Sequence, residues 1–360
     1  MTSSVQTGEM TSFLTTDSNI LARAGEALGG ARVLITGGAG FIGSHVADIL
    51  AGAGVAEIVI IDNMVRGRID NLGAVLPTGK VRVLDGDIRD VSLMSGLVRR
   101  VDFVFHFAAL RITQCAAEPR AAVEVMVDAT FELVEACRQS PVKKIVMASS
   151  ASIYGMADAF PTGESHHPYG NRTLYGAAKV FGEGLLRSYC DMYGIDYVCL
   201  RFFNVYGPRM DIHGKYTEVL IRWMERLDTG EVPLIFGDGT QTMDLLHVRD
   251  VERSCVLAAI APATDVALNV GGGTETSLFQ LAKMLAEVMD QPDIIPEFRP
   301  ERAVNPVPRR LADVSMARDL IGFETTIQLA DGLRELVNWW RSERGNRSSA
   351  AAGAHAGTRA

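Results

Sequence analysis

The 360-residue sequence lacks several features that would assign it to a broad class of protein. Its apolar runs, such as 58–61 and 101–110, are only as long as a strand, far short of the 18 or more apolar residues of a membrane-spanning helix. Its first residues lack the basic start and apolar core of a secretory signal. With 35 basic and 43 acidic residues, the net charge of −8 lacks the basic excess of a nucleic-acid-binding protein.

Cysteine is also scarce, and its spacing excludes the common thiolate metal sites. The five cysteines are widely separated and form no Cys-x-x-Cys pair. Reduced, buried thiols are expected of such a pattern. These absences together predict a cytoplasmic protein with no membrane and no nucleic-acid partner.

Short β-rich runs alternate with helical patterns through the first part of the chain. The runs lie at 32–36, 58–62, 81–85, 103–107, 144–149 and 197–203. This alternation predicts an α/β fold with a doubly wound parallel sheet over 31–204, and a later contribution from about 237–268. The looser rhythm of 205–342 predicts a smaller C-terminal α+β lobe, while 1–30 and 343–360 are expected to be a flexible extension and a disordered tail.

A glycine-rich turn follows the first predicted strand and precedes a helical pattern. Gly38, Gly40 and Gly43 have the spacing of the dinucleotide-binding fingerprint, in which small residues let the backbone approach a pyrophosphate at the helix N-terminus. Asp62 ends the next strand 19 residues after Gly43, where a carboxylate accepts hydrogen bonds from ribose hydroxyls. The first domain is therefore predicted to be a Rossmann-type NAD-binding domain, with Asp87 placed to meet the adenine. Because Arg66 and Arg68 follow closely, NADP stays an alternative.

A tyrosine and a lysine are spaced for acid-base chemistry. Tyr175 and Lys179 are four residues apart in a helical pattern, so they share one helix face. Lowering a phenol pKa of about 10 by about 3 units needs about 4 kcal/mol, and an ammonium ~5 Å away supplies about 3 kcal/mol at an effective dielectric constant of ~20. A positive nicotinamide ring would supply the rest. Ser150 ends a predicted strand, where parallel sheets place their ligand crevice.

These motifs occur in an order that resembles the extended short-chain dehydrogenase/reductase family, in particular its nucleotide-sugar epimerase branch. The resemblance covers about 31–342 and also includes Asp62-Asn63, Asp87-Ile88, the stretch 106–109, the stretch 201–208 and the stretch 237–250. It implies tightly held NAD, a C-terminal lobe over a nucleotide-diphosphate sugar, and homodimers joined through helices at about 115–138 and 176–193.

The resemblance also implies the roles of individual residues. The expected catalytic residues are Ser150, Tyr175 and Lys179. The expected cofactor-binding residues are Gly37, Gly40, Phe41, Ile42, Gly43, Asp62, Asn63, Asp87, Ile88, Ala108, Tyr175 and Lys179. The expected substrate-binding residues are Arg111, Ser150, Ser152, Tyr175, Asn204, Arg302 and Arg310.

Departures from the family pattern bear on the reaction. Ala151 and Ser152 stand where dehydratases carry an Asp-Glu pair and decarboxylases a Glu, so a second acid or base for those reactions is lacking. Met243 stands near the place of a phosphate-binding arginine in many relatives. Arg310 takes the place of a small-pocket Tyr or Cys and is a candidate to select an acidic sugar such as a uronic acid.

The histidines show no metal-binding pattern in the sequence. His166 and His167 are adjacent but have no carboxylate or thiol at ligand spacing, so no metal is expected. His106 and His247 fall at strand ends and are expected to be structural.

The function predicted from the sequence is NAD-dependent nucleotide-sugar epimerisation. It is expected at C4 of a UDP-hexose or UDP-uronic acid, through a transient 4-keto sugar. A nucleotide-sugar 4-keto reductase or dehydrogenase is the alternative, and a dehydratase, a decarboxylase and a non-enzymatic NAD-binding module are disfavoured.

Overall fold

A computed structural model gives the fold and describes residues 18–213, 218–300 and 307–356. Its centre is a seven-stranded sheet in the order β11-β6-β5-β4-β1-β2-β3, in which every neighbouring pair is parallel. The strands are β1 (Arg32–Thr36), β2 (Glu57–Asp62), β3 (Val81–Asp85), β4 (Phe103–His106), β5 (Lys144–Ser150), β6 (Tyr197–Phe202) and β11 (Val266–Val270). The predicted doubly wound parallel sheet is confirmed.

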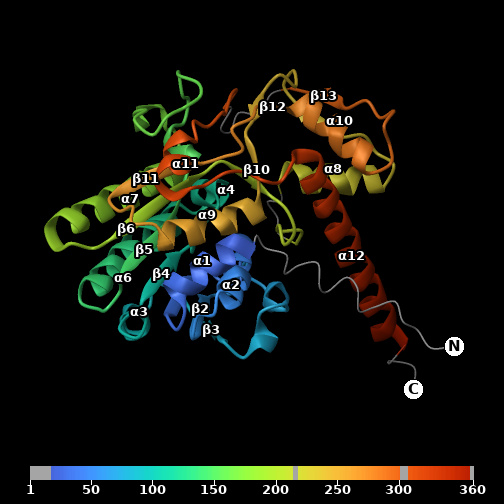
Figure 1. The fold of residues 1–360 in the computed structure, drawn as a ribbon. Coiled ribbons are helices and arrows are strands. Elements are labelled where there is room, and N and C mark those ends of the chain that lie inside the picture. Colours follow the sequence, from blue (N-terminus) through green and yellow to red (C-terminus); the bar gives the residue numbers. More distant parts are fainter. Residues whose placement is uncertain (1–17, 214–217, 301–306, 357–360) are drawn as a thin grey trace.

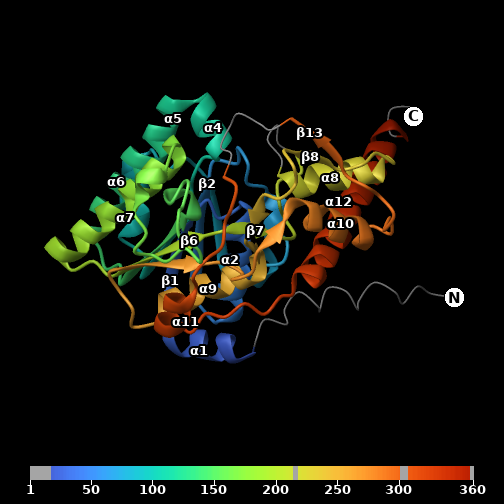
Figure 2. The ribbon, with the colours of Figure 1, turned by 90° about the horizontal axis from the view of Figure 1, so that it is seen from above.

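Helices cover both faces of the sheet and bury one apolar cluster on each side. One face carries α1 (Ser18–Leu28), α2 (Phe41–Gly52), α9 (Val248–Ile260) and α11 (Ser315–Ile321). The other carries α3 (Val91–Val98), α6 (Ala129–Arg138) and α7 (Leu174–Tyr193). Figure 2 shows α6 and α7 on the side of the sheet opposite α9 and α11. Strands buried on both faces are apolar at successive positions, as Ile58 to Ile61 are.

A second lobe lies beside the carboxyl ends of the central strands and has its own core around Trp223 and Trp340 (Figure 1). It contains α8 (Val219–Asp228), α10 (Leu278–Val288) and α12 (Leu329–Ala356). Three two-stranded sheets pair β7 (Asn204–Tyr206) with β10 (Leu245–His247), β9 (Thr242–Met243) with β12 (Thr276–Ser277), and β8 (Leu234–Phe236) with β13 (Glu297–Arg299).

The remaining elements are short and lie in the connections. They are α4 (Ile112–Ala117), α5 (Pro119–Val123), η2 (Ile69–Leu72), η3 (Leu76–Thr78), η4 (Glu124–Asp128), η5 (Ala151–Ile153) and η6 (Pro168–Gly170). In the described ranges, no helix has the length and apolar character required to cross a membrane.

Two expectations about the chain ends are corrected by the structure. The extension expected to be flexible at 1–30 contains helix α1, whose Ile20, Ala24 and Leu28 are buried against the sheet. The tail expected to be disordered at 343–360 continues α12 as far as Ala356. Residues 1–17 and 357–360 lie outside the described part of the chain.

Candidate active site

The glycine turn between β1 and α2 is shaped by close backbone contacts. Gly37 has a φ of +68°, and a Cβ there would lie 2.8 Å from the backbone nitrogen of Ala108. A Cβ on Gly43 would lie 2.5 Å from the carbonyl oxygen of Gly37. The N-cap of α2 is Gly40, which has no side chain to occupy the first amides of the helix. These amides therefore face the cleft and suit a pyrophosphate.

The Asp62 carboxylate is fixed at the end of β2. It accepts hydrogen bonds of 3.0 Å from the backbone N–H groups of Ala39 and Met64, and Asp62 is 8 % exposed. Burial raises the pKa of Asp62, and the two backbone N–H groups act against that rise. A Cβ on Gly67 would come within 2.5 Å of the carboxylate, so this position must be small. The turn and Asp62 together fit an adenosine ribose and diphosphate.

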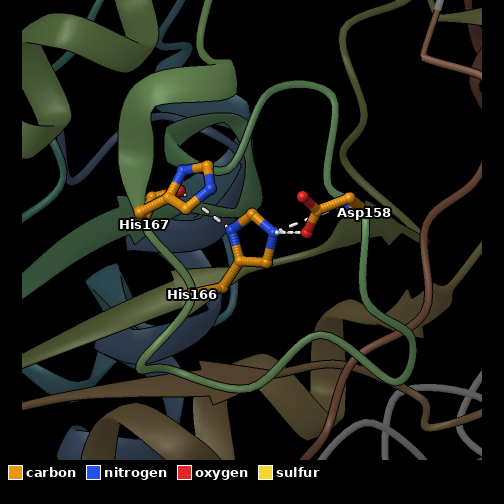
Figure 3. Close-up of side chains that lie close together, drawn as sticks. All are labelled: Asp158, His166 and His167. Carbon is orange, nitrogen blue, oxygen red and sulfur yellow. Dashed lines mark hydrogen bonds and ion pairs between the residues drawn. The ribbon is translucent and has the colours of Figure 1, made fainter.

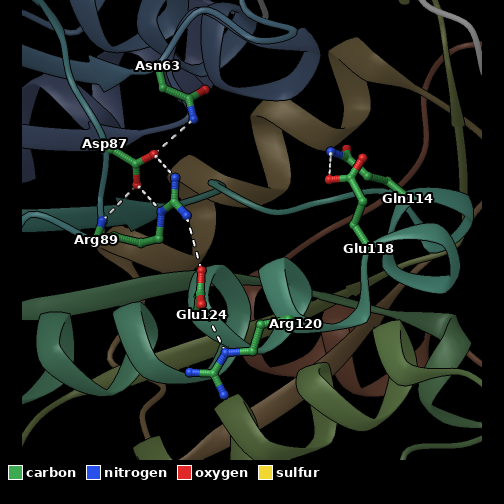
Figure 4. Close-up of polar contacts among 7 residues, drawn as sticks. All are labelled: Asn63, Asp87, Arg89, Gln114, Glu118, Arg120 and Glu124. Atoms are coloured by element: carbon green, nitrogen blue, oxygen red, sulfur yellow. Dashed lines mark hydrogen bonds and ion pairs between the residues drawn. The ribbon is translucent and has the colours of Figure 1, made fainter.

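The predicted adenine-side residues form a hydrogen-bonded chain (Figure 4). Asp87 accepts from Asn63 Nδ2 at 3.3 Å and from Arg89 Nη2 at 2.8 Å. Arg89 also reaches Glu124, which accepts from Arg120 Nε at 2.9 Å. Hydrogen bonding to Arg89 lowers the pKa of Asp87 to about 2. Arg89 is not among the residues predicted from the sequence. Its position two residues after Asp87 is the feature of the sequence that could have indicated this ion pair.

The three residues predicted to be catalytic lie together on one wall of the cleft. Ser150 ends β5 and accepts from the backbone N–H of Ser152 at 3.1 Å. Tyr175 and Lys179 lie in the first turns of α7, which begins after its N-cap Thr173. Lys179 Nζ donates to the carbonyl oxygen of Ala148 at 2.6 Å, which ties α7 to β5.

Burial dominates the acid-base properties of this pair. Burial raises the pKa of Tyr175, whereas the Ser150 side chain and the charge of Arg66 act to lower it. Burial lowers the pKa of Lys179 to about 8. The sequence predicts that Lys179 supplies most of the acidification of Tyr175, but in the structure burial is the largest influence on the pKa of Tyr175 and raises it. Ionisation of the phenol therefore depends on additional positive charge, which is what a nicotinamide ring supplies.

A single cleft of about 1660 Å³ joins the glycine turn to the catalytic wall. It is lined by Gly37, Asp62, Asp87, Ser150, Tyr175 and Lys179 from the first domain and by α8 and Met243 from the second lobe. Pockets for one drug-sized ligand measure about 300–1,000 Å³, so this cleft has room for more than one such molecule. The residues present thus fit a dinucleotide together with a second ligand.

Of the residues predicted to bind substrate, some line the cleft and others are held by backbone groups elsewhere. Ser152 and Arg111 line the cleft, and Arg111 lies 3.6 Å from carboxylate oxygens of both Asp211 and Glu218. Asn204 donates instead to the backbone oxygen of Asp244 at 3.1 Å. Arg310 Nη1 donates to the backbone oxygen of Ala151 at 3.0 Å, and burial lowers its pKa to about 10.

Asn204 and Arg310 are not among the residues that line the cleft in the described part of the chain. Arg302 lies outside the described residues.

Two ion pairs near the cleft are not indicated by the sequence. Arg66 lies 3.6 Å from Asp211, so residues from both lobes meet across the cleft. Beneath α7, Arg201 makes a two-pronged ion pair with Glu183, with bonds of 2.9 and 2.7 Å, and Glu183 also accepts from Ser149. These pairs join segments far apart in sequence, and no local motif indicates them.

The histidines expected to be structural are held by neighbours. His106 Nδ1 lies 2.7 Å from the hydroxyl of Thr36, and its Nε2 lies 3.2 Å from that of Thr130. Burial lowers the pKa of His106 to about 3. His247 caps α9 through a hydrogen bond from the backbone of Arg249.

The sequence shows no partner carboxylate at ligand spacing for His166 and His167, but the structure places one beside them. Asp158 lies eight residues earlier, and its Oδ1 is 2.9 Å from His166 Nε2. The loop between η5 and η6 folds back on itself, which brings the three side chains together.

Comparison with known proteins agrees with this geometry. The NAD dependent epimerase/dehydratase family matches residues 33–271. A UDP-glucose 4-epimerase of Mycolicibacterium smegmatis is 36% identical over 315 residues, which cover 87% of this chain and 99% of that protein.

Two solved structures extend the comparison. A UDP-N-acetylglucosamine 4-epimerase from Methanobrevibacter ruminantium M1, in complex with UDP-N-acetylmuramic acid, superposes with a TM-score of 0.82 at 32% identity, covering 88% of this chain and 99% of that one. A second structure is a UDP-glucuronic acid 4-epimerase mutant from Bacillus cereus in complex with UDP-4-deoxy-4-fluoro-glucuronic acid and NAD. It superposes with a TM-score of 0.78 at 27% identity, and the match covers 86% of this chain and 99% of that one.

Proposed function

The chain belongs to the NAD-dependent epimerase/dehydratase family, and we propose that within it the protein is a nucleotide-sugar 4-epimerase. The observation that carries this proposal is one continuous cleft with the glycine turn and Asp62 in one part and Ser150, Tyr175 and Lys179 in another. The proposed substrate is a UDP-hexose or a UDP-uronic acid, as in the relatives' names.

The chain's own residues divide the work of the proposed reaction. NAD, when bound, supplies the hydride acceptor and then the hydride donor. The Tyr175 oxygen takes the proton of the C4 hydroxyl as a 4-keto sugar forms and returns it when the configuration at C4 has been inverted. Ser150 orients the C4 oxygen beside Tyr175, and the ammonium of Lys179 stabilises the phenolate. The second lobe covers the keto sugar and excludes water.

Residues 151 and 152 favour epimerisation over elimination of water. Dehydration or decarboxylation needs a second acid or base beside the sugar, and Ala151 and Ser152 supply none. The Ser152 backbone N–H is already used as a donor to Ser150. Epimerisation needs only the removal and return of hydrogen at one carbon.

The test combines product analysis with a matched pair of variants. Purified protein without added cofactor is incubated with UDP-, GDP-, CDP- and dTDP-sugars, and we expect an isomeric product of unchanged mass. Tyr175→Phe is expected to lower turnover by at least about 10²-fold and to retain NAD. Tyr169→Phe, in an exposed position, is the control and keeps wild-type turnover.

Two other results would overturn the proposed reaction. Steady consumption of added NADH would indicate a reductase, and a product lighter by one water would indicate a dehydratase. Undiminished turnover in Tyr175→Phe would remove Tyr175 as the base.

We also propose a cytoplasmic homodimer. All five cysteines are free, which is typical of a reducing compartment. Helices α6 and α7 expose the large apolar side chains Phe131, Phe181, Met192 and Tyr193, which supports a helical interface between two copies.

A further inference from the structure

Three potential metal ligands meet in the loop that joins the Ser150 strand to the Tyr175 helix. One oxygen of Asp158 and one imidazole nitrogen each from His166 and His167 all lie within 4.8 Å of one another. Figure 3 shows the Asp158 carboxylate facing the His166 ring, with the His167 ring on the other side of that ring. These residues have no part in the proposed hydride and proton transfers.

Hydrogen bonds fix the orientation of the His166 ring. Its Nδ1 lies 2.8 Å from the carbonyl oxygen of His167, so Nδ1 must carry the proton and donate it. His166 Nε2 lies 2.9 Å from Asp158 Oδ1, and the backbone nitrogen of Asp158 lies 3.3 Å from the same Nε2. The carboxylate and the backbone of Asp158 therefore both face this nitrogen.

An imidazole nitrogen and a carboxylate oxygen at this distance share one positive group. Without a metal ion that group is a proton on Nε2, which Asp158 accepts. A divalent cation that replaces this proton is bound by the nitrogen and the carboxylate together. An imidazole that donates its other N–H to a backbone carbonyl is the usual arrangement of a metal-binding histidine.

Burial and stacking orient the ligands while leaving one side accessible. The His166 side chain is 6% exposed and meets the Tyr154 ring edge-on, whereas the Asp158 side chain is 77% exposed. The His167 ring stacks on the exposed Tyr169 ring at a centroid distance of 5.4 Å. The cluster is thus fixed from the protein side and open to an ion from solvent.

We propose that Asp158, His166 and His167 bind one divalent transition metal ion, with water in its remaining positions. Two imidazoles and one carboxylate match the preferences of Zn²⁺, Co²⁺ and Ni²⁺ and not those of Mg²⁺ or Ca²⁺. The ion pins the loop, because Asp158 and His166 lie on its two arms and Met156 N donates to the carbonyl oxygen of Gly170 at 3.2 Å. The site is structural and lies beside the entry to α7.

The test measures metal binding directly on the full chain, purified without a histidine tag and stripped with a chelator. We expect one equivalent of Co²⁺ to produce visible ligand-field absorption, one equivalent of Zn²⁺ to bind in calorimetry, and Zn²⁺ to raise the melting temperature. Asp158→Asn and His167→Gln, both at exposed positions, are expected to weaken binding at least tenfold. The matched controls Asp238→Asn and His213→Gln alter an acid and a histidine outside the cluster and should bind as wild type does.

Three results would overturn the proposed site. They are the absence of a stoichiometric Co²⁺ or Zn²⁺ signal in the wild type, equal binding by Asp158→Asn or His167→Gln, and a nitrogen NMR spectrum of His166 with both ring nitrogens protonated and unchanged by Zn²⁺. None of these readouts depends on epimerase activity, so the metal site and the proposed function fail or stand separately.

Discussion

The ammonium group of Lys179 lies 5.7 Å from the centroid of the Tyr175 ring. It is held there by the carbonyl oxygen of Ala148 at the end of β5, and Lys179 is 8 % exposed. A buried ammonium beside a phenol is costly in the protein alone and becomes useful when the phenol ionises. This pair therefore links stability, pH and activity.

Lys179→Met tests that link. The pKa of Lys179 is about 8 in the folded protein and 10.5 in an exposed lysine, so the unfolded chain binds more protons between these values. The free energy of unfolding of the wild type should therefore rise by about 3 kcal/mol as the pH increases from about 8 to 10.5. The methionine variant should lose this rise and also lose turnover, as measured by denaturant unfolding at several pH values and by product assay.

The control for this prediction is Lys143→Met, whose side chain is 66% exposed. It should leave both the pH dependence and turnover as in the wild type. An identical pH dependence in Lys179→Met and the wild type would contradict the buried-ammonium explanation.

Asp62→Asn tests the choice between NAD and NADP. The Asp62 carboxylate accepts from two backbone N–H groups, and an amide can accept only with its oxygen, so one N–H would face an NH₂ group. A hydrogen bond from a ribose hydroxyl to the charged carboxylate contributes about 1.5–3 kcal/mol, so its weakening should lower NAD affinity by about tenfold or more. NADP affinity should fall less, because the carboxylate no longer repels the 2′-phosphate.

The two affinities are measured by titration of the cofactor-free protein. Glu57→Gln, 38% exposed at the opposite end of β2, should keep the wild-type ratio of NAD to NADP affinity. If Asp62→Asn also keeps this ratio, the carboxylate does not select the cofactor.

The central sheet was predictable because each strand has its own local pattern. The run expected at 58–62 is β2 (Glu57–Asp62), and those expected at 32–36 and 81–85 are β1 and β3. Buried parallel strands are continuously apolar and are bounded by turn residues. Both features can be read from the local sequence without knowledge of distant contacts. The glycine turn and the Tyr175–Lys179 spacing are local for the same reason.

The parts that were missed depend on packing between distant segments. Helix α1 buries only Ile20, Ala24 and Leu28, and this sparse apolar stripe was too weak to indicate a packed helix. Asp158 approaches His166 only because the intervening loop reverses, and Arg66 meets Asp211 only because the two lobes face each other. The end of α12 is rich in alanine, which favours a helix and was instead interpreted as a flexible tail.

Glu252 is a second residue that makes the stability of the protein depend on pH. It is 6 % exposed in α9, and burial raises its pKa to about 8. Its neighbour His45, at 3.7 Å, has a pKa lowered to about 3, so its own linkage is confined below the ordinary histidine value of 6.5. Folded Glu252 retains its proton to about pH 8 whereas the unfolded chain releases it near 4.5, so stability should fall as pH rises between them.

The decrease in stability caused by Glu252 can be measured separately between about pH 6.5 and 8, because His45 no longer changes the stability in that range. Over this window we expect a loss of about 2 kcal/mol in the free energy of unfolding. Glu252→Gln keeps the shape of the neutral side chain and should remove the fall, and the exposed Glu225→Gln should not. A fall of equal size in Glu252→Gln would exclude Glu252 as its source.

Phe181→Glu tests the proposed helical interface between two copies. Phe181 is 37% exposed on α7, and Phe131 is 40% exposed on the adjacent α6. In a symmetric dimer the same patch is used twice, so one substitution buries two carboxylates opposite apolar side chains. The dimer dissociation constant should rise by more than about 100-fold, measured by light scattering and sedimentation across a concentration series.

The control for the interface is Leu320→Glu, because Leu320 is 41% exposed on α11, on the face of the sheet opposite α6 and α7. It adds the same charge and should leave the dimer intact. A wild type that is monomeric at every concentration, or a Phe181→Glu variant that dimerises as strongly as Leu320→Glu, would place any contact between copies on another surface. Since Tyr175 and Lys179 lie on α7 as well, turnover measured on the Phe181→Glu monomer also shows whether the pairing of this helix with a second copy is needed to hold the catalytic pair in place.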